Sequence, residues 1–188
     1  PYSQPERLVA IWESNPRFPH VWISYPSFQD WRRSARSFQQ MVAFRWQGYD
    51  VTSPGTPAHL DGKSISAGFF ATLGVSLALG RDFTAQEDQA GGAPVVIISN
   101  RLWRYRFGGG PEAVGKVLTM DGVNYTITGV LQPRFQFEDG ADMYTPLAQA
   151  DPVFLNDRGD HDSTLAIARL RPGVSIAQAQ AEIGTIQK

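Results

Sequence analysis

The sequence predicts an α+β fold, with split βαβ character at its two ends and a separate unit inserted between them. Apolar residues recur at helical spacing in several separated segments. Short β-prone runs lie between these segments without regular alternation. Asp121-Gly122 separates two such runs, which is the pattern of a β-hairpin. This mixed order favours α+β architecture over a repeated βαβ unit.

The composition excludes several classes of protein. The chain has 188 residues, 42% of them hydrophobic, enough for one sizeable core or two small cores in contact. Its net charge of -1 gives no overall field that would favour nucleic acid or an anionic membrane. The absence of cysteine excludes disulfide scaffolds, thiolate zinc sites and cysteine nucleophiles, and fits an extracytoplasmic domain or, nearly as well, a cytosolic one.

The chain carries no apolar run of about twenty residues, so we expect no transmembrane helix of its own, and it carries no signal peptide pattern. It begins abruptly and ends in mid-pattern. We therefore expect it to be part of a longer protein.

The first third is expected to form strands at 8–12, 41–51 and 58–65, with a helix beginning near Pro26, a residue suited to a first helical turn. Four apolar residues at spacings of three, four and three are expected to form the buried face of this helix: Phe28, Trp31, Ala35 and Phe38. Alternating residues of the second strand are expected to point inward: Val42, Phe44 and Trp46.

The stretch 66–88 is expected to mark a boundary between two packed units. Ser66 is expected to cap a short helix that ends at Gly74, where a left-handed residue is needed. The apolar residues of that helix are Phe69, Phe70 and Leu73, and a crossing segment with alternating Val75, Leu77 and Leu79 follows. Thr84 and Glu87 have the spacing of a capping box.

The rest of the chain alternates strands and helices. The four β-branched residues 95–98 predict a strand buried on both faces. A helix capped by Ser99 or Asn100 follows, with Trp103 and Phe107 in its buried stripe. A hairpin of 116–120 and 123–131, a short strand at 143–147, a polar loop at 151–163 and a strand at 164–170 come next. Ser175 caps the last helix, whose apolar face is Ile176, Ala179, Ile183 and Ile186.

The segment 110–117 nearly matches a phosphate-binding loop. Val117 stands where a hydroxyl would hold Mg²⁺, and Pro111 removes one N–H that would contact phosphate. The segment also joins a helix to a hairpin, whereas phosphate loops join a strand to a helix. We do not expect a nucleotide site here.

The acidic loop 157–162 is the densest group of metal-ligand types, with Asp157, Asp160, His161 and Asp162. It lacks the spacing and terminal Glu of an EF-hand, so a solvated loop is favoured and cation binding stays open. The three histidines are too scattered for zinc. Arginines 101, 104 and 106 interleave with aromatic residues, but as the exposed flank of a helix and not as a nucleic-acid site.

A set of ordered motifs resembles one family. They are Ser24–Trp31 (SYPSFQDW), Gly68–Gly74 (GFFATLG), Leu79–Phe83 (LGRDF), Glu87-Asp88, Val95–Ser99 (VVIIS), Leu102-Trp103, Arg106–Gly108, Val114–Lys116 and Tyr125–Val130 (YTITGV). In this order the sequence resembles the MacB-like periplasmic core domain of ABC-type permeases, and among these the long duplicated permeases of unknown substrate.

The resemblance implies two subdomains: a porter-like split βαβ unit at 1–74 plus 151–188, and a smaller inserted α+β unit at 75–150. It implies a periplasmic domain between transmembrane helices of a permease of the inner membrane. The implied partners are those helices, a cytoplasmic ATP-binding subunit that acts indirectly, and a second copy in a dimer. Nucleic acid is not among them.

The implied function is to couple transmembrane-helix motion to events outside the membrane, in efflux or mechanotransmission. The family brings no catalytic residues to transfer, so we expect no catalytic, cofactor-binding or metal-binding residues, no cofactor and no enzyme activity. The alternative is a module that captures a peptide, lipid or glycan in the cleft between the subdomains.

Overall fold

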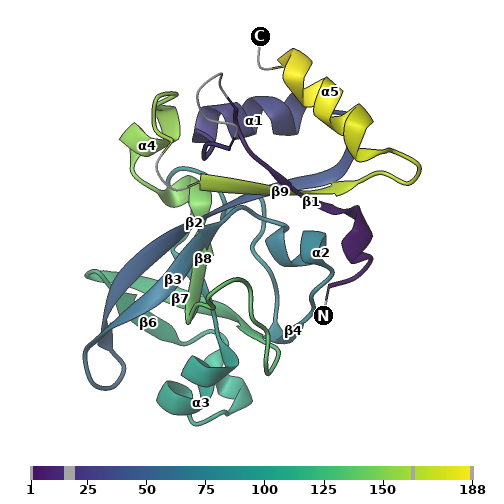
Figure 1. Ribbon diagram of the computed structural model, residues 1–188. Helices are drawn as coiled ribbons and strands as arrows, with labels where there is room; N and C mark the ends of the chain where they lie inside the picture. Colours follow the sequence, from purple (N-terminus) through teal and green to yellow (C-terminus); the bar gives the residue numbers. More distant parts are fainter. Residues whose placement is uncertain (1, 15–19, 162–163, 187–188) are drawn as a thin grey trace.

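The computed structural model describes residues 2–14, 20–161 and 164–186, and it is a mixed α+β structure (Figure 1). The strands are β1 (Leu8–Ile11), β2 (Phe38–Ser53), β3 (Ala58–Ile65), β4 (Leu77–Gly80), β5 (Val95–Ile98), β6 (Val117–Met120), β7 (Val123–Leu131), β8 (Met143–Pro146) and β9 (Thr164–Leu170). The α-helices are α1 (Tyr25–Ser34), α2 (Phe69–Leu73), α3 (Asn100–Phe107), α4 (Pro152–Asn156) and α5 (Ile176–Ile186). Short 3₁₀ turns lie at η1 (Pro5–Arg7), η2 (Pro111–Ala113) and η3 (Leu147–Gln149).

The nine strands belong to one sheet, in the order β1-β9-β2-β3-β8-β5-β7-β4. The ninth, β6, pairs with both β2 and β7. These pairings close a ring of hydrogen-bonded neighbours that runs β2-β3-β8-β5-β7-β6 and returns to β2. Closing a sheet on itself removes the free edges of the strands in the ring. Outside the ring, β1 and β4 are the strands that end the linear order.

The long strand β2 contributes to three hydrophobic clusters. Met41 packs with α1 and α5, Phe44 packs with α2 and the loop after β7, and Val51 packs inside the ring with α3. Because successive side chains of a strand point to opposite faces, one strand can supply the first two clusters from adjacent positions. In Figure 1, α1 and α5 lie at the opposite end of the molecule from α3.

The hairpin and the buried strand are confirmed. Asp121 and Gly122 have φ of 49° and 75° and connect β6 to β7, as a two-residue turn with left-handed residues requires. Val95 to Ile98 are all buried, since one face of β5 packs inside the ring and the other packs toward α2. The fold class predicted from the sequence is therefore that of the structure.

Two predicted placements in the first third are wrong. Helix α1 ends at Ser34, and Phe38 opens β2 instead of extending the helix. Phe38 still packs in the same cluster as Trp31, although it reaches that cluster from a strand and its helical spacing from Trp31 is a coincidence. Trp46, expected to point inward, is 38% exposed, and its ring lies beside those of Trp22 and Phe44.

Three further expectations need correction. Ser66 does not cap α2: Gly68 is the N-cap residue, and Ser66 Oγ accepts a hydrogen bond from Ala43 N at 2.9 Å. The polar stretch 151–163 contains α4, whose N-cap Asp151 accepts from Val153 N at 2.7 Å. Ile176 in the first turn of α5 is 62% exposed, although Ala179 and Ile183 of the same face are buried.

The other capping expectations hold. Gly74 ends α2 with φ of 72°. Ser99 Oγ accepts from Leu102 N at 3.0 Å at the start of α3, and Ser175 Oγ accepts from Gln178 N at 3.2 Å. Thr84 Oγ1 accepts from Glu87 N at 3.2 Å in a turn and not in a helix. The division into units 1–74 plus 151–188 and 75–150 remains a proposal.

Candidate functional site

In the segment resembling a phosphate loop, backbone N–H groups donate to carbonyl groups of the protein itself. Gly115 N donates to Ile127 O at 2.8 Å and Lys116 N to Ala113 O at 3.1 Å. The Lys116 ammonium lies 3.5 Å from the carboxylate of Glu112. A phosphate would therefore find few free N–H donors in this segment.

The acidic loop is tied to the rest of the chain by its own side chains. Asp157 Oδ1 accepts from Gly159 N, and Arg158 pairs with Asp30 at 2.7 Å. The His161 ring lies 3.1 Å from the Glu13 carboxylate. Asp162 lies outside the described residues. Among the residues that the structure describes, no three His, Asp or Glu side chains gather as a metal site would need.

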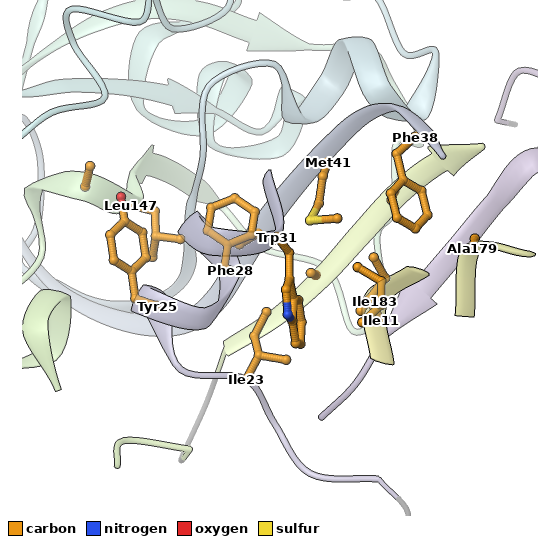
Figure 2. Packing of buried hydrophobic residues seen from close by; sticks show 14 of the residues in the cluster. Ile11, Ile23, Tyr25, Phe28, Trp31, Phe38, Met41, Leu147, Ala179 and Ile183 are labelled. Atoms are coloured by element: carbon orange, nitrogen blue, oxygen red, sulfur yellow. The ribbon is translucent and has the colours of Figure 1, made fainter. Parts of the chain in front are cut away.

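The candidate functional site is instead the cluster where the first strand and the last helix meet. Ile11 of β1, Trp31 of α1 and Ile183 of α5 are buried in one hydrophobic cluster, together with residues of β2 and β9 (Figure 2). Phe28 and Trp31 are at most 1% exposed. The cluster contains side chains of β1, α1 and α5, and a hollow of about 420 Å³ is lined by residues of both β1 and α5.

Polar contacts brace the same end of the molecule. Glu182 on α5 accepts from Arg36 N at 2.7 Å and Ser37 N at 2.8 Å, in the turn between α1 and β2. Burial acts to raise the pKa of Glu182, but these hydrogen bonds prevail and lower it. Before β1, Arg7 donates from Nε to Leu170 O at 2.9 Å. Helix α5 is thus fixed to the turn before β2, and the segment before β1 is fixed to β9.

A second brace surrounds Arg169, which is buried on β9. Its guanidinium donates to Thr72 O at 2.7 and 2.9 Å, to Ser3 O at 2.8 Å and to Gln4 O at 3.3 Å. Thr72 belongs to the last turn of α2, whose carbonyl groups lack partners within the helix. Arg169 therefore links the N-terminal segment, α2 and β9.

An aromatic surface lies where β2 leaves the buried sheet. Trp22 and Trp46 are 39% and 38% exposed, with ring centroids 6.1 Å apart. The buried Lys63 lies next to Trp46. Its ammonium is 4.8 Å from the centroid of the Trp46 ring and 3.4 Å from the Glu138 carboxylate. The rings of Phe44 and Phe137 lie 5.8 Å from the same ammonium, so cation–π attraction partly replaces lost hydration.

A partly buried carboxylate, that of Asp82, lies in the stretch 66–88. Asp82 Oδ1 accepts from Phe83 N at 2.7 Å, and its Oδ2 is buried without a hydrogen-bond partner among the described residues. Burial, with a smaller contribution from the Asp88 charge, raises the pKa of Asp82 to about 6. Nearby, the hydrogen bond from Arg81 lowers the pKa of Glu87 to about 2.

These two carboxylates predict opposite effects of pH on stability. The native state holds a proton on Asp82 that the unfolded chain has lost, so its contribution to stability falls as pH rises from about 4 through 6. The free energy of unfolding of Asp82→Asn, relative to that of the wild type, should rise by roughly 2 kcal/mol between pH 4 and pH 7.5. Urea unfolding at each pH measures this difference.

Glu87→Gln is the matched control. The folded pKa of Glu87 lies below its unfolded value, so its stabilising contribution is present above about pH 4.5 and is lost as pH falls toward 2. The stability of Glu87→Gln relative to the wild type should therefore fall with rising pH. A constant difference between wild type and Asp82→Asn at every pH would contradict a raised pKa at Asp82.

The sequence analysis missed these linking residues. Arg169 carries a detectable signal, since it is a charged residue inside the apolar run 164–170. Lys63 and Glu182 carry none, because their partners are distant in sequence and only the fold brings them together.

Comparisons with known proteins follow the fold. A family model described as MacB-like periplasmic core domain matches residues 2–186. A search of curated proteins finds no match. Within the described part of the chain, no helix combines the length and apolar character needed to cross a membrane.

Three solved structures share the fold at low sequence identity. A domain of a protein described as a permease, from Porphyromonas gingivalis, has a TM-score of 0.76 and 19% identity over 100% of this chain and 85% of that one. The periplasmic region of MacB from Actinobacillus actinomycetemcomitans has 0.72 and 15%, over 97% and 83%. The extracellular domain of the noncanonic ABC-type transporter YknZ from Gram-positive bacteria has 0.61 and 17%, over 93% and 86%.

Proposed function

The chain belongs to the family of MacB-like periplasmic core domains, and from this premise we propose that it couples motion of transmembrane helices to events outside the membrane. Family membership makes it an extracytoplasmic domain of an ABC-type permease, a class of transporter domain and not of enzyme. The finer role, in efflux or mechanotransmission, is our proposal.

The observation that supports coupling is the shared core of β1 and α5. Ile11 and Ile183 lie in one cluster with Trp31, and Glu182 and Arg7 fix the flanking segments to β2 and β9. Helices joined near β1 and α5 would move this end of the domain as one body, since packed cores transmit displacement. The proposed partners are those helices, the ATP-binding subunit indirectly, and a second copy of the domain.

A cross-link between two copies tests the proposal in the full permease. These 188 residues contain no cysteine, so Ala177→Cys on the exposed side of α5 introduces one defined thiol in a permease whose other cysteines have been replaced. Joining two copies with a reducible bifunctional maleimide should lower both transport and ATP turnover, and reduction should restore them. The same variant labelled with a monofunctional maleimide is the control. Unchanged transport and ATP turnover in the cross-linked dimer would reject the coupling role.

The alternative is a module that captures a peptide, lipid or glycan between the two proposed units. A hollow of about 330 Å³ is the feature that favours it, because Asp61 of the first proposed unit and Ser99, Arg101 and Phe135 of the inserted one are among its lining residues. Ligand density that copurifies at this hollow would support capture. Capture would be linked to transport only if binding of that ligand changes ATP turnover.

A further inference from the structure

A cavity of about 390 Å³ lies between α3 and the start of β3, beside the mouth of the closed ring. Its lining is mostly carbon, from Ala58 and Leu60 of β3 and from Leu102 and the Tyr105 ring of α3. Tyr105 is 79% exposed, so an occupant would remove a large apolar ring from water. This volume lies within the usual range for small-molecule sites, which favour the mouths of barrels.

The charges around the cavity leave an excess of positive charge. Asp142 is its one carboxylate, and it accepts from Arg101 Nε at 3.1 Å and from Ser99 Oγ at 2.9 Å. Arg106 donates only to neutral carbonyl groups, among them Thr56 O at 2.7 Å. Arg104, further along α3, bonds to the neutral side chain of Asn100. Arg101 therefore balances Asp142, while Arg106, the other arginine that lines the cavity, has no acid partner in these contacts.

The walls of the cavity are held in place before any ligand arrives. Arg106 ties α3 to the loop before β3 through the carbonyl groups of Pro54 and Thr56. Leu102 is buried in the cluster inside the ring, so the cavity side of α3 rests on a packed core. A site whose walls are already ordered loses less conformational freedom on binding.

We propose that this cavity binds the alkyl chain of a single-chain amphiphile whose headgroup is a carboxylate. The apolar lining fits the chain, and the arginines of α3 provide charge complementarity for the headgroup, which guanidinium groups recognise well. Helix α3, which forms one wall of the cavity, lies at the opposite end of the molecule from α5 (Figure 1), so the site is distinct from the proposed coupling core.

Calorimetric titration of the 188-residue chain with dodecanoate, below its micelle concentration, tests the proposal. We expect one site per chain and a rise in Tm with ligand concentration. Dodecyltrimethylammonium, with the same chain and the opposite charge, should bind at least about tenfold more weakly. Absence of dodecanoate binding would overturn the site, and equal binding of the two amphiphiles would overturn the anionic headgroup.

A substitution that fills the cavity tests whether dodecanoate binds there. Ala58→Trp places an indole at the rim on an exposed strand position, where tryptophan is well tolerated, and should weaken dodecanoate binding at least about tenfold. Ala177→Trp replaces an exposed alanine on α5, away from the cavity, and should bind as the wild type does. Equal affinity of Ala58→Trp and the wild type would overturn the location.

Discussion

Replacing Arg169 with alanine is expected to lower the free energy of unfolding by about 3–5 kcal/mol. The substitution removes a buried guanidinium and leaves the carbonyl groups of Thr72, Ser3 and Gln4 without their donors. Each hydrogen bond from a charged group contributes about 1.5–3 kcal/mol, and an unsatisfied buried acceptor adds to the loss. Urea unfolding followed by tryptophan fluorescence measures the change.

Arg171→Ala is the matched control for this substitution. Arg171 is exposed and donates from Nε to one carbonyl, that of Arg36, so its loss should cost less than about 1 kcal/mol. Amide exchange adds a local measurement: Ser3 N, which donates to Leu73 O, should lose protection in Arg169→Ala only. Similar unfolding energies for the two variants would show that Arg169 does not hold these segments together.

The second large effect is expected at Phe44. The centroid of its ring lies 4.8 Å from that of Phe137, 5.9 Å from that of Phe69 and 5.4 Å from that of Trp46. Phe44 is 1% exposed. Phe44→Ala should therefore cost about 3–5 kcal/mol, because it leaves a cavity among rings fixed by their neighbours. Thermal and urea unfolding report the loss.

Phe135→Ala gives the comparison for Phe44→Ala. The Phe135 ring also makes edge contacts, with Phe70 and Tyr144, but it is only partly buried. The same deletion should therefore cost clearly less there. If both substitutions cost the same, burial at the centre of this cluster would not be what stabilises it.

The sequence was informative wherever a local rule decides the conformation. The Asp121-Gly122 turn, the left-handed Gly74 and the apolar strand 95–98 each follow from a few adjacent residues, and each is confirmed. The family motifs likewise predicted the matched family. Function at this coarse level needed no reactive side chain.

Long-range packing explains the errors. Phe38 has helical spacing from Trp31, but the β2–β9 pairing begins at Phe38 and holds it in a strand. Ser66 has a good capping composition, yet Ala43 on β2 lies close enough to donate to its hydroxyl. The ring closed by β6 pairing with β2 and β7 depends on register between distant strands, which no local pattern records.

The pairing of β1 with β9 has a consequence for how the chain folds during synthesis. Leu8 is paired with Arg169, so β1 has no partner until the residues of β9 have been made. At about 5–20 residues per second, that wait is roughly 8–30 s. During this interval an uncharged apolar strand remains open to wrong partners, and its late closure gives the domain a high contact order and slow folding. The first strand of the domain must therefore be kept from wrong partners until β9 has been translated.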